Sequence, residues 1–378
     1  MQKNKIRFLQ KTLAVALSTF LLTASACSQQ TEPQKTANTA ISPSDQPESE
    51  AAAVSPSNGV SETAQAESTE PVTDVPSAPA EMKQIGISQF AAHPSLDNCR
   101  KGFILGLQEG GYEEGKNINI VFENAQGDMS VVTSIAQKFL AAKFDVVCGI
   151  ATPVVQGTAT VLKGSGIPLV FNAVSDPIGA GLVESFDQPT DEITGVSDQL
   201  PIDRELELIR AMLPEAKTIG ILYTSSEANS HTQLIQFQEA APKYGFTIES
   251  VAITATADLP NAIDVLLPKV DCIQNLTDNT VVSGLPQILE KANAEKKPVF
   301  GSEEEQVVNG CLASEGIDYI QLGKQCGLQA AKILDGIPAS QIPVETVSES
   351  QLTLNQTVAD QLGIQISEEM LARARSIS

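Results

Sequence analysis

From Lys83 onward, short β-branched runs alternate with longer amphipathic stretches. One such run, Val146–Ile150, precedes a helix-like segment at 154–162. This repeated strand–helix order is typical of α/β proteins with parallel sheets. The pattern pauses after 193–196 and restarts at 218–223, so we expect two lobes, each with a doubly wound parallel sheet. The expected strands are 85–88, 118–122, 146–150, 168–171, 193–196, 218–223, 246–253, 272–276 and 298–300, and the expected helices are 96–110, 130–142, 154–162, 232–244, 259–267 and 287–294.

The N-terminus has the three parts of an export signal. Basic residues precede an apolar run at 8–22, and Ala24 to Ala26 are small residues directly before Cys27. A cysteine at this point resembles the bacterial lipobox, which implies cleavage of residues 1–26 and lipidation of Cys27. The protein would then be exported and lipid-anchored to the outer face of the cell membrane. An ordinary cleaved signal is the alternative, since a membrane span needs about 20 apolar residues.

Residues 27–82 differ in composition from the rest of the chain. They are rich in Ser, Thr, Ala, Pro, Gln and Glu, and nine acidic residues face the single Lys35. A segment with so few large apolar residues cannot bury enough surface to fold. We therefore expect a disordered, self-repelling tether between the anchor and the folded part.

The charge and the cysteines exclude several classes of function. The formal net charge of −22 disfavours nucleic acid, whose phosphates would repel the chain. Beyond Cys27 five cysteines remain without C-x-x-C spacing, and an odd number fits poorly with a disulfide framework. With two histidines there is little material for a metal site, and we expect neither a metal nor a cofactor.

Loops after the expected strands carry groups suited to an α-amino acid. The ligand's carboxylate needs hydrogen-bond donors, and helix N-termini favour anions. Thr152 with Pro153, and Ser175 with Asp176, supply hydroxyls and backbone N–H groups at such positions. We assign these four residues to the carboxylate, while helix capping remains the alternative for Thr152 and Ser175.

The ammonium group needs a counter-charge, because burying it unpaired is costly. Asp278, beside Asn279, and either Glu303 or Glu304 follow expected strands of the second lobe. We expect one of these carboxylates, first of all Asp278, to pair with the ammonium. A solvated helix start is the alternative for the glutamates.

The first expected strand is followed by Gln89, Phe90 and His93, which we place along the pocket for the ligand's side chain. Tryptophan is absent and aromatic residues make up 4% of the chain, so few rings are available for stacking. The identity of the ligand's side chain stays open on this evidence.

Several longer blocks spread over nearly all of 84–374 carry a resemblance to a known family. The blocks are 86–90 (GISQF), 93–97 (HPSLD), 124–128 (NAQGD), 150–153 (IATP), 173–182 (AVSDPIGAGL), 223–229 (YTSSEAN), 277–280 (TDNT), 316–319 (GIDY) and 354–364 (LNQTVADQLGI). In sequence and in order they resemble the ABC-transporter substrate-binding proteins of the tryptophan/tyrosine-binding type.

The resemblance implies a type I periplasmic-binding-protein fold, with two lobes joined by three hinge segments and a ligand in the cleft. It places the crossings near 197–201, after a strand at 310–314, and near 338–344, with a helix at 322–334 returning to the first lobe. The lobes would comprise 83–199 plus 316–340 and 200–315 plus 341–378. It also makes Ser226 and Asn229, on either side of Glu227, ligand contacts.

The function implied is capture of a small zwitterion, an aromatic amino acid first of all, by a monomer that delivers it to an ABC permease. A ligand-sensing lipoprotein that reports to a membrane receptor, or binding of another small molecule, remains open. An enzyme is disfavoured because the chain has no G-x-S-x-G, H-E-x-x-H or P-loop motif. A DNA-binding repressor of the same fold would need a helical module where this chain has an export signal and an acidic tether.

Overall fold

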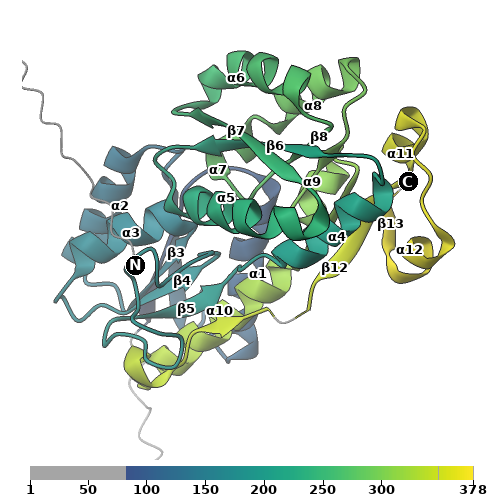
Figure 1. Cartoon of the computed structure of the whole chain (residues 1–378). Helices are drawn as coiled ribbons and strands as arrows, with labels where there is room; N and C mark the ends of the chain where they lie inside the picture. Colours follow the sequence, from purple (N-terminus) through teal and green to yellow (C-terminus); the bar gives the residue numbers. More distant parts are fainter. Residues whose placement is uncertain (1–81, 348, 378) are drawn as a thin grey trace, which may run out of the picture. The chain divides into compact units, whose positions relative to one another are not determined.

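The computed structural model describes residues 82–347 and 349–377. The predicted signal, Cys27 and the tether up to residue 81 lie outside the described residues. Within them, strands and helices alternate through two lobes, as the sequence predicts (Figure 1). No helix in this part of the chain is both long and apolar enough to cross a bilayer.

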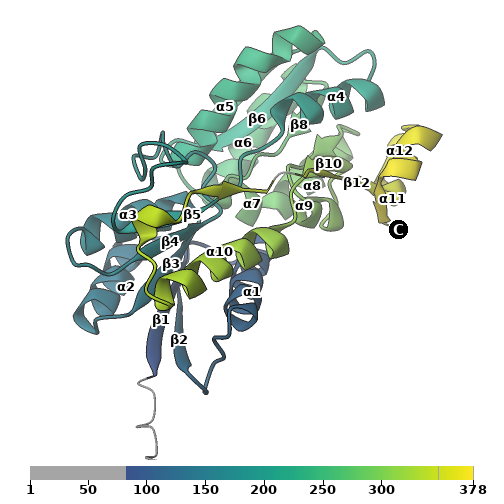
Figure 2. The same cartoon turned by 90° about the horizontal axis from the view of Figure 1, so that it is seen from below.

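The first lobe is built on a six-stranded sheet in the order β11-β5-β4-β3-β1-β2, and every neighbouring pair is parallel. Figure 2 shows α2 and α3 on one side of this sheet and α1 and α10 on the other, so the predicted doubly wound arrangement is confirmed. The elements of this lobe are β1 (Lys83–Gln89), α1 (Pro94–Glu109), β2 (Ile118–Asn124), α2 (Met129–Ala141), β3 (Val146–Ile150), α3 (Thr152–Leu162), β4 (Leu169–Asn172), β5 (Ile193–Ser197), α10 (Tyr319–Leu334) and β11 (Glu345–Thr346).

The second lobe has a parallel four-stranded sheet in the order β7-β6-β8-β9. Helices α6 and α8 cover one face and α4 and α5 the other (Figure 1). Its elements are α4 (Ile202–Met212), β6 (Thr218–Thr224), α5 (Ala228–Ala240), β7 (Thr247–Ile253), α6 (Leu259–Leu266), β8 (Cys272–Gln274), α7 (Asn279–Ser283), α8 (Leu285–Ala294), β9 (Val299–Phe300) and α9 (Glu304–Val308).

A third, small sheet completes this lobe, and the sequence did not indicate it. Its strands are ordered β10-β12-β13, with β10 and β12 antiparallel. The backbone N–H of Leu312 donates to the carbonyl of Val299 at 2.7 Å, which joins this sheet to β9. The elements are β10 (Ala313–Gly316), β12 (Gln351–Asn355), α11 (Gln356–Leu362), α12 (Glu368–Arg373) and β13 (Arg375–Ile377).

The chain passes between the lobes three times. The first passage joins β5 to α4 and the second joins β10 to α10. The third was expected near 338–344, but the structure places it between β11 and β12. Before it, Glu345 and Thr346 pair with Val196 and Ser197, so the first lobe extends past the expected boundary at residue 340.

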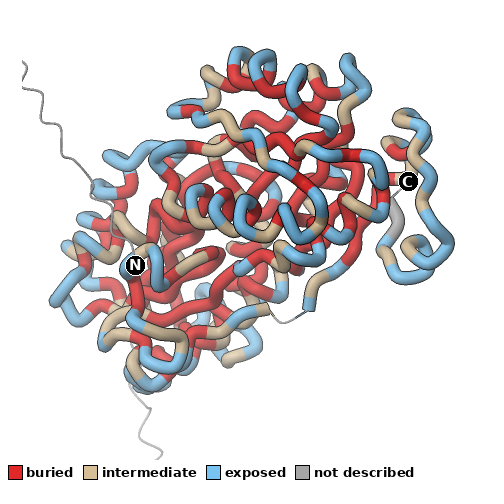
Figure 3. Tube along the Cα trace, viewed as in Figure 1, coloured by how far each residue is buried: buried red, intermediate tan, exposed pale blue. Residues whose placement is uncertain are grey.

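The buried residues follow the strands and the inner faces of the helices (Figure 3). Phe103, Phe139 and Phe171 are among the largest fully buried side chains of the first lobe. The five described cysteines are buried free thiols, and a cysteine in such a place packs as a small apolar residue: Cys99, Cys148, Cys272, Cys311 and Cys326.

Helices α1 and α10 cross at glycines on both sides. A Cβ on Gly106 would lie 2.1 Å from the carbonyl oxygen of Lys324, and one on Gly327 would lie 2.2 Å from that of Phe103. Such distances are far below van der Waals contact, so neither position has room for a side chain. Gly102 and Gly323 are equally crowded, each at 2.1 Å from a backbone carbonyl of the facing helix. The four glycines therefore let the two backbones touch.

We predict that Gly106→Ala lowers the free energy of unfolding by about 2 kcal/mol, because the added methyl group forces the helices apart and overpacking costs about 1–3 kcal/mol. Urea denaturation measures the effect. Gln108→Ala, on the exposed face of the same helix, is the matched control and should leave the midpoint nearly unchanged. Equal midpoints for the two variants would contradict the close-packing argument.

Candidate functional site

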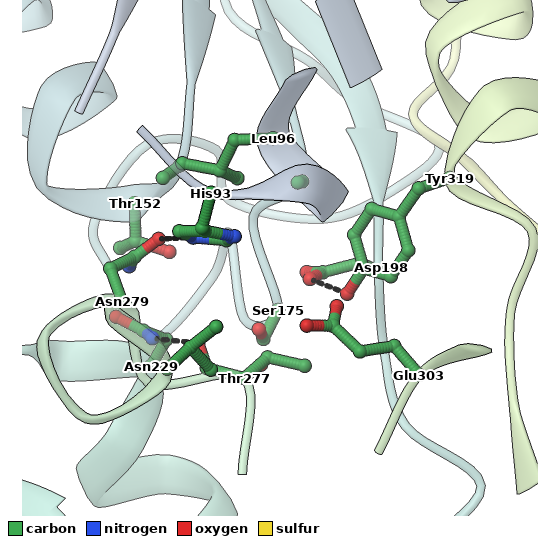
Figure 4. Close-up of a pocket in the computed structure, with 13 residues that line it drawn as sticks. His93, Leu96, Thr152, Ser175, Asp198, Asn229, Thr277, Asn279, Glu303 and Tyr319 are labelled. Atoms are coloured by element: carbon green, nitrogen blue, oxygen red, sulfur yellow. Dashed lines mark hydrogen bonds between the residues drawn. The ribbon is translucent and has the colours of Figure 1, made fainter. Parts of the chain in front are cut away.

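A small cavity lies between the ends of the first-lobe strands and the facing loops of the second lobe (Figure 4). Its volume is about 10 Å³, room for about one water molecule, so the two lobes are closed on each other here. Of the described residues that line it, none is a lysine or an arginine. The lining residues are His93, Leu96, Ala151, Thr152, Ala173, Ser175, Asp198, Asn229, Thr277, Asn279, Val282, Glu303 and Tyr319.

The structure brings together six of the residues expected at the site: His93, Thr152, Ser175, Asn229, Asn279 and Glu303. Sequence reasoning missed two others that carry chemistry, Asp198 and Tyr319. A signal was present for both, because Asp198 directly follows β5 and Tyr319 follows β10 by a short loop. Asp198 falls in the expected hinge segment 197–201 and Tyr319 in the block 316–319, and neither is assigned to the ligand from the sequence.

Asp198 is a buried carboxylate, 3% exposed, in the first passage between the lobes. Its Oδ2 accepts a hydrogen bond of 2.9 Å from the hydroxyl of Tyr319, and its Oδ1 is sealed from solvent without a partner. Burial raises the pKa of Asp198 above its ordinary value, and interactions with the hydroxyls of Tyr319 and then Ser175 offset this in part. A cation at Oδ1 would satisfy this group.

Glu303 approaches the same end of the cavity from the second lobe (Figure 4). It is 1% exposed, and its Oε1 accepts a hydrogen bond of 2.9 Å from the amide of Gln306. Burial, and next the charge of Glu305, raise the pKa of Glu303 to about 8. Two desolvated carboxyl groups thus meet in a cavity whose described lining includes neither lysine nor arginine.

The other groups suited to a ligand come from the ends of β3 and β4. Thr152 opens the eleven-residue helix α3, whose N-terminal N–H groups favour an anion. The residue before it, Ala151, has φ of 84°, and Ala173, which follows β4, has φ of 58°. Non-glycine residues rarely adopt these angles, and such strain clusters at ligand sites. Ser175 lies two residues further on, with its hydroxyl near the amide of Gln233.

Polar contacts join the two lobes around the cavity. Each is a hydrogen bond between a first-lobe and a second-lobe side chain, so all of them must break when the lobes part. They are Gln233 Nε2 to Ser175 Oγ at 3.1 Å, Thr232 Oγ1 to Asp176 Oδ2 at 3.2 Å, Asn98 Nδ2 to Glu305 Oε1 at 2.5 Å, and His93 Nε2 to Asn279 Oδ1 at 3.4 Å.

Asp278 does not line the cavity, contrary to the expectation that it pairs with an ammonium group. It is fully buried within the second lobe, where it caps α7 by accepting the N–H of Val281 at 2.9 Å. It also accepts bonds from the N–H and hydroxyl of Thr224 and from the hydroxyl of Ser230. Both carboxylate oxygens are therefore occupied by local donors, which makes this residue structural.

Glu227 does not line the cavity either, but it supports a residue that does. Its carboxylate accepts the backbone N–H groups of Asn279 and Thr280, each at 3.0 Å, and their side-chain donors. Burial, followed by the charge of Asp278, raises the pKa of Glu227 to about 7. It fixes the loop that carries Asn279.

The remaining expected residues lie outside the cavity. Phe90 packs in the first-lobe core, and Pro153 is buried in the first turn of α3. Gln89 is buried, and its amide donates to Ala91 O and Asp97 Oδ1. Asp176 accepts from Thr232 and from the N–H of Gly179, Ser226 is exposed, and Glu304 pairs with Arg375 at 2.9 Å.

Comparison with known proteins agrees with this arrangement. Residues 84–378 match a family described as ABC transporter substrate binding protein. A tyrosine-binding protein of Clostridioides difficile (strain R20291) is 41% identical over 283 residues, which cover 75% of this chain and 81% of that protein.

Two solved structures cover 79% of this chain. An ABC domain from Streptococcus pneumonia in complex with L-Trp has a TM-score of 0.76 and 39% identity, and all of it is covered. The ligand-free, open structure of a substrate-binding protein with adhesive properties from Clostridium difficile has a TM-score of 0.61 and 37% identity, with 99% covered. At nearly equal identity, the present structure is thus nearer to the tryptophan complex than to the open form.

We predict that Glu303→Gln changes how stability depends on pH. The wild-type carboxyl has a pKa of about 8 when folded and about 4.5 when unfolded, so the folded state binds the extra proton between these values. The free energy of unfolding should therefore fall as pH rises from about 4.5 to about 8, by at most about 1.4 kcal/mol per pH unit. The variant should lack the part of this decline that Glu303 contributes, while Glu227 and Asp198, whose pKa values are also raised, keep theirs.

Urea denaturation at pH 5 and pH 8 provides the measurement. Glu290→Gln removes a charge from the exposed side of α8 and should keep the wild-type pH dependence. Parallel pH profiles for Glu303→Gln and the wild type would show that Glu303 is not the group that takes up the proton.

Proposed function

Because this chain belongs to the family of ABC transporter substrate-binding proteins, which work outside the cytoplasm with a membrane permease, we propose that it captures an aromatic amino acid between its lobes. The observation that carries the proposal is the pair of buried carboxyl groups, Asp198 and Glu303, in a cavity lined by no described lysine or arginine. The ligand's ammonium group supplies the missing positive charge and takes Oδ1 of Asp198 as a hydrogen-bond acceptor.

The ligand's carboxylate is placed against the first turn of α3. Thr152 and the hydroxyl of Ser175 offer donors there, and the helix dipole favours a negative charge. The ammonium end of the zwitterion thus lies beside carboxyl groups, and the carboxylate end lies beside hydrogen-bond donors. A neutral sugar would leave the desolvated carboxyl groups without a cation, which favours the amino acid.

A second cavity adjoins the first and suits the side chain. Its volume is about 210 Å³, and it shares His93, Val282 and Glu303 with the first. Pro94, Leu285 and Pro286 give it apolar walls. That one relative is a tyrosine-binding protein and another was solved with L-Trp supports an aromatic side chain here.

For this ligand, Asp198→Asn should weaken the binding of L-tryptophan by about 2–5 kcal/mol, because the change removes one charge of a desolvated pair and preserves the shape. Indole-3-propionate, which lacks the amino group, should lose far less. Titration calorimetry with both compounds checks this. Asp264→Asn, at an exposed carboxylate on α6, is the control and should bind as the wild type does. Equal weakening for both compounds would mean that Asp198 does not contact the ammonium.

We also propose that Cys27 carries a lipid that holds the protein at the outer face of the membrane. The order of basic residues, apolar run, small residues and cysteine supports this. Cys27→Ala should release the protein into the soluble fraction or leave an unprocessed precursor, as fractionation and immunoblotting would show. Incorporation of a labelled fatty acid into the Cys27→Ala protein would contradict the proposal.

A further inference from the structure

His93 lies at the boundary between the two cavities. It directly precedes α1, is 8% exposed, and lines both cavities. With Val282 and Glu303 it is one of the three residues that the two cavities share, so a ligand that extends from the first into the second passes beside these three side chains. Which nitrogen of the His93 ring carries the hydrogen therefore decides whether a ligand group beside it must donate or accept a hydrogen bond.

Hydrogen bonds that run from Glu227 through Asn279 to His93 fix which nitrogen of the His93 ring carries the hydrogen. Glu227 Oε2 accepts the Asn279 side-chain amide at 2.7 Å, so Nδ2 of Asn279 points toward Glu227. The amide oxygen of Asn279 consequently faces His93, at 3.4 Å from Nε2 (Figure 4). Because that oxygen only accepts, the hydrogen of the ring must reside on Nε2.

The opposite nitrogen of His93 is then an acceptor. Burial lowers the pKa of His93 to about 4, so the ring is neutral at pH 7 and carries one N–H. With that hydrogen on Nε2, Nδ1 presents a lone pair. Nδ1 is sealed from solvent and has no partner among the described residues. A buried acceptor left in this state is unfavourable until a donor reaches it.

We propose that His93 is a specificity-determining residue that selects ligands whose aromatic side chain carries a hydrogen-bond donor. The phenol O–H of tyrosine or the indole N–H of tryptophan satisfies Nδ1, whereas phenylalanine leaves it unpaired. A site built to accept a hydrogen bond rejects an analogue that lacks the donor. The inference rests on the proposed binding of aromatic amino acids and adds the rule by which they are distinguished.

Two matched ligand pairs test this rule on the purified full-length protein. Tyrosine and phenylalanine differ by the hydroxyl, and tryptophan and 3-benzothienyl-L-alanine differ by sulfur in place of the indole N–H. Titration calorimetry should give a Kd at least tenfold lower for the donor-bearing member of each pair. His93→Phe, which keeps a ring of similar size, should bring both ratios close to one.

Two further variants guard against a folding defect. His93→Gln supplies an amide oxygen as acceptor and should restore part of the discrimination. His231→Phe, at the exposed second histidine on α5, should leave both ratios unchanged.

The outcomes separate this inference from the proposed function. Wild-type ratios near one, or ratios that survive in His93→Phe, would overturn the role of His93 while aromatic amino acid binding stands. Equal weakening of all four ligands by His93→Phe would overturn it too, since His93 would then contact the head group they share. If the wild-type protein binds none of the four, the proposed function fails and the inference fails with it.

Discussion

The contact of α1 with α10 positions the site. Four glycines bring the two helices together so closely that backbone meets backbone, and no other residue fits at these points. The helices begin on the same side: α1 starts just after His93, and α10 starts at Tyr319. The crossing therefore carries both residues to the cavity wall. It also fastens α10 to the first lobe directly after the second passage, so the hydroxyl of Tyr319 reaches Asp198 from a fixed point.

The cavity is electrostatically incomplete in a way that suits a binding protein. Burying an ionised carboxylate without a cation costs several kcal/mol. Here Asp198 lies in the first passage between the lobes and Glu303 belongs to the second lobe. Under the proposed function, the ligand's ammonium group lies between these two groups and offsets the cost. Side-chain hydrogen bonds between the lobes, such as Gln233 to Ser175, hold the closed arrangement once it forms.

Much of the fold could be predicted because α/β order is a local property. The strand Val146–Ile150 was found at its observed bounds, and most other strands within a few residues. What escaped prediction depends on distant partners. The antiparallel pairing of β10 with β12 joins segments some forty residues apart, and β11 is a two-residue strand that exists only because β5 offers an edge. Short strands of this kind carry no periodic signal of their own.

By itself, the sequence determined the class of fold, the family and the kind of chemistry in the loops after the strands. Only the tertiary structure decided which carboxylates line the cavity. Asp278 and Asp198 both follow strands and look alike in sequence, yet Asp278 is surrounded by local donors that occupy both of its oxygens, whereas Asp198 has one oxygen without a partner. The tertiary structure also decided the role of His93, because its contact with Asn279 from the other lobe determines which ring nitrogen is the hydrogen-bond acceptor. Side-chain direction and the supply of donors are properties of the packed neighbourhood, and no spacing along the chain encodes them.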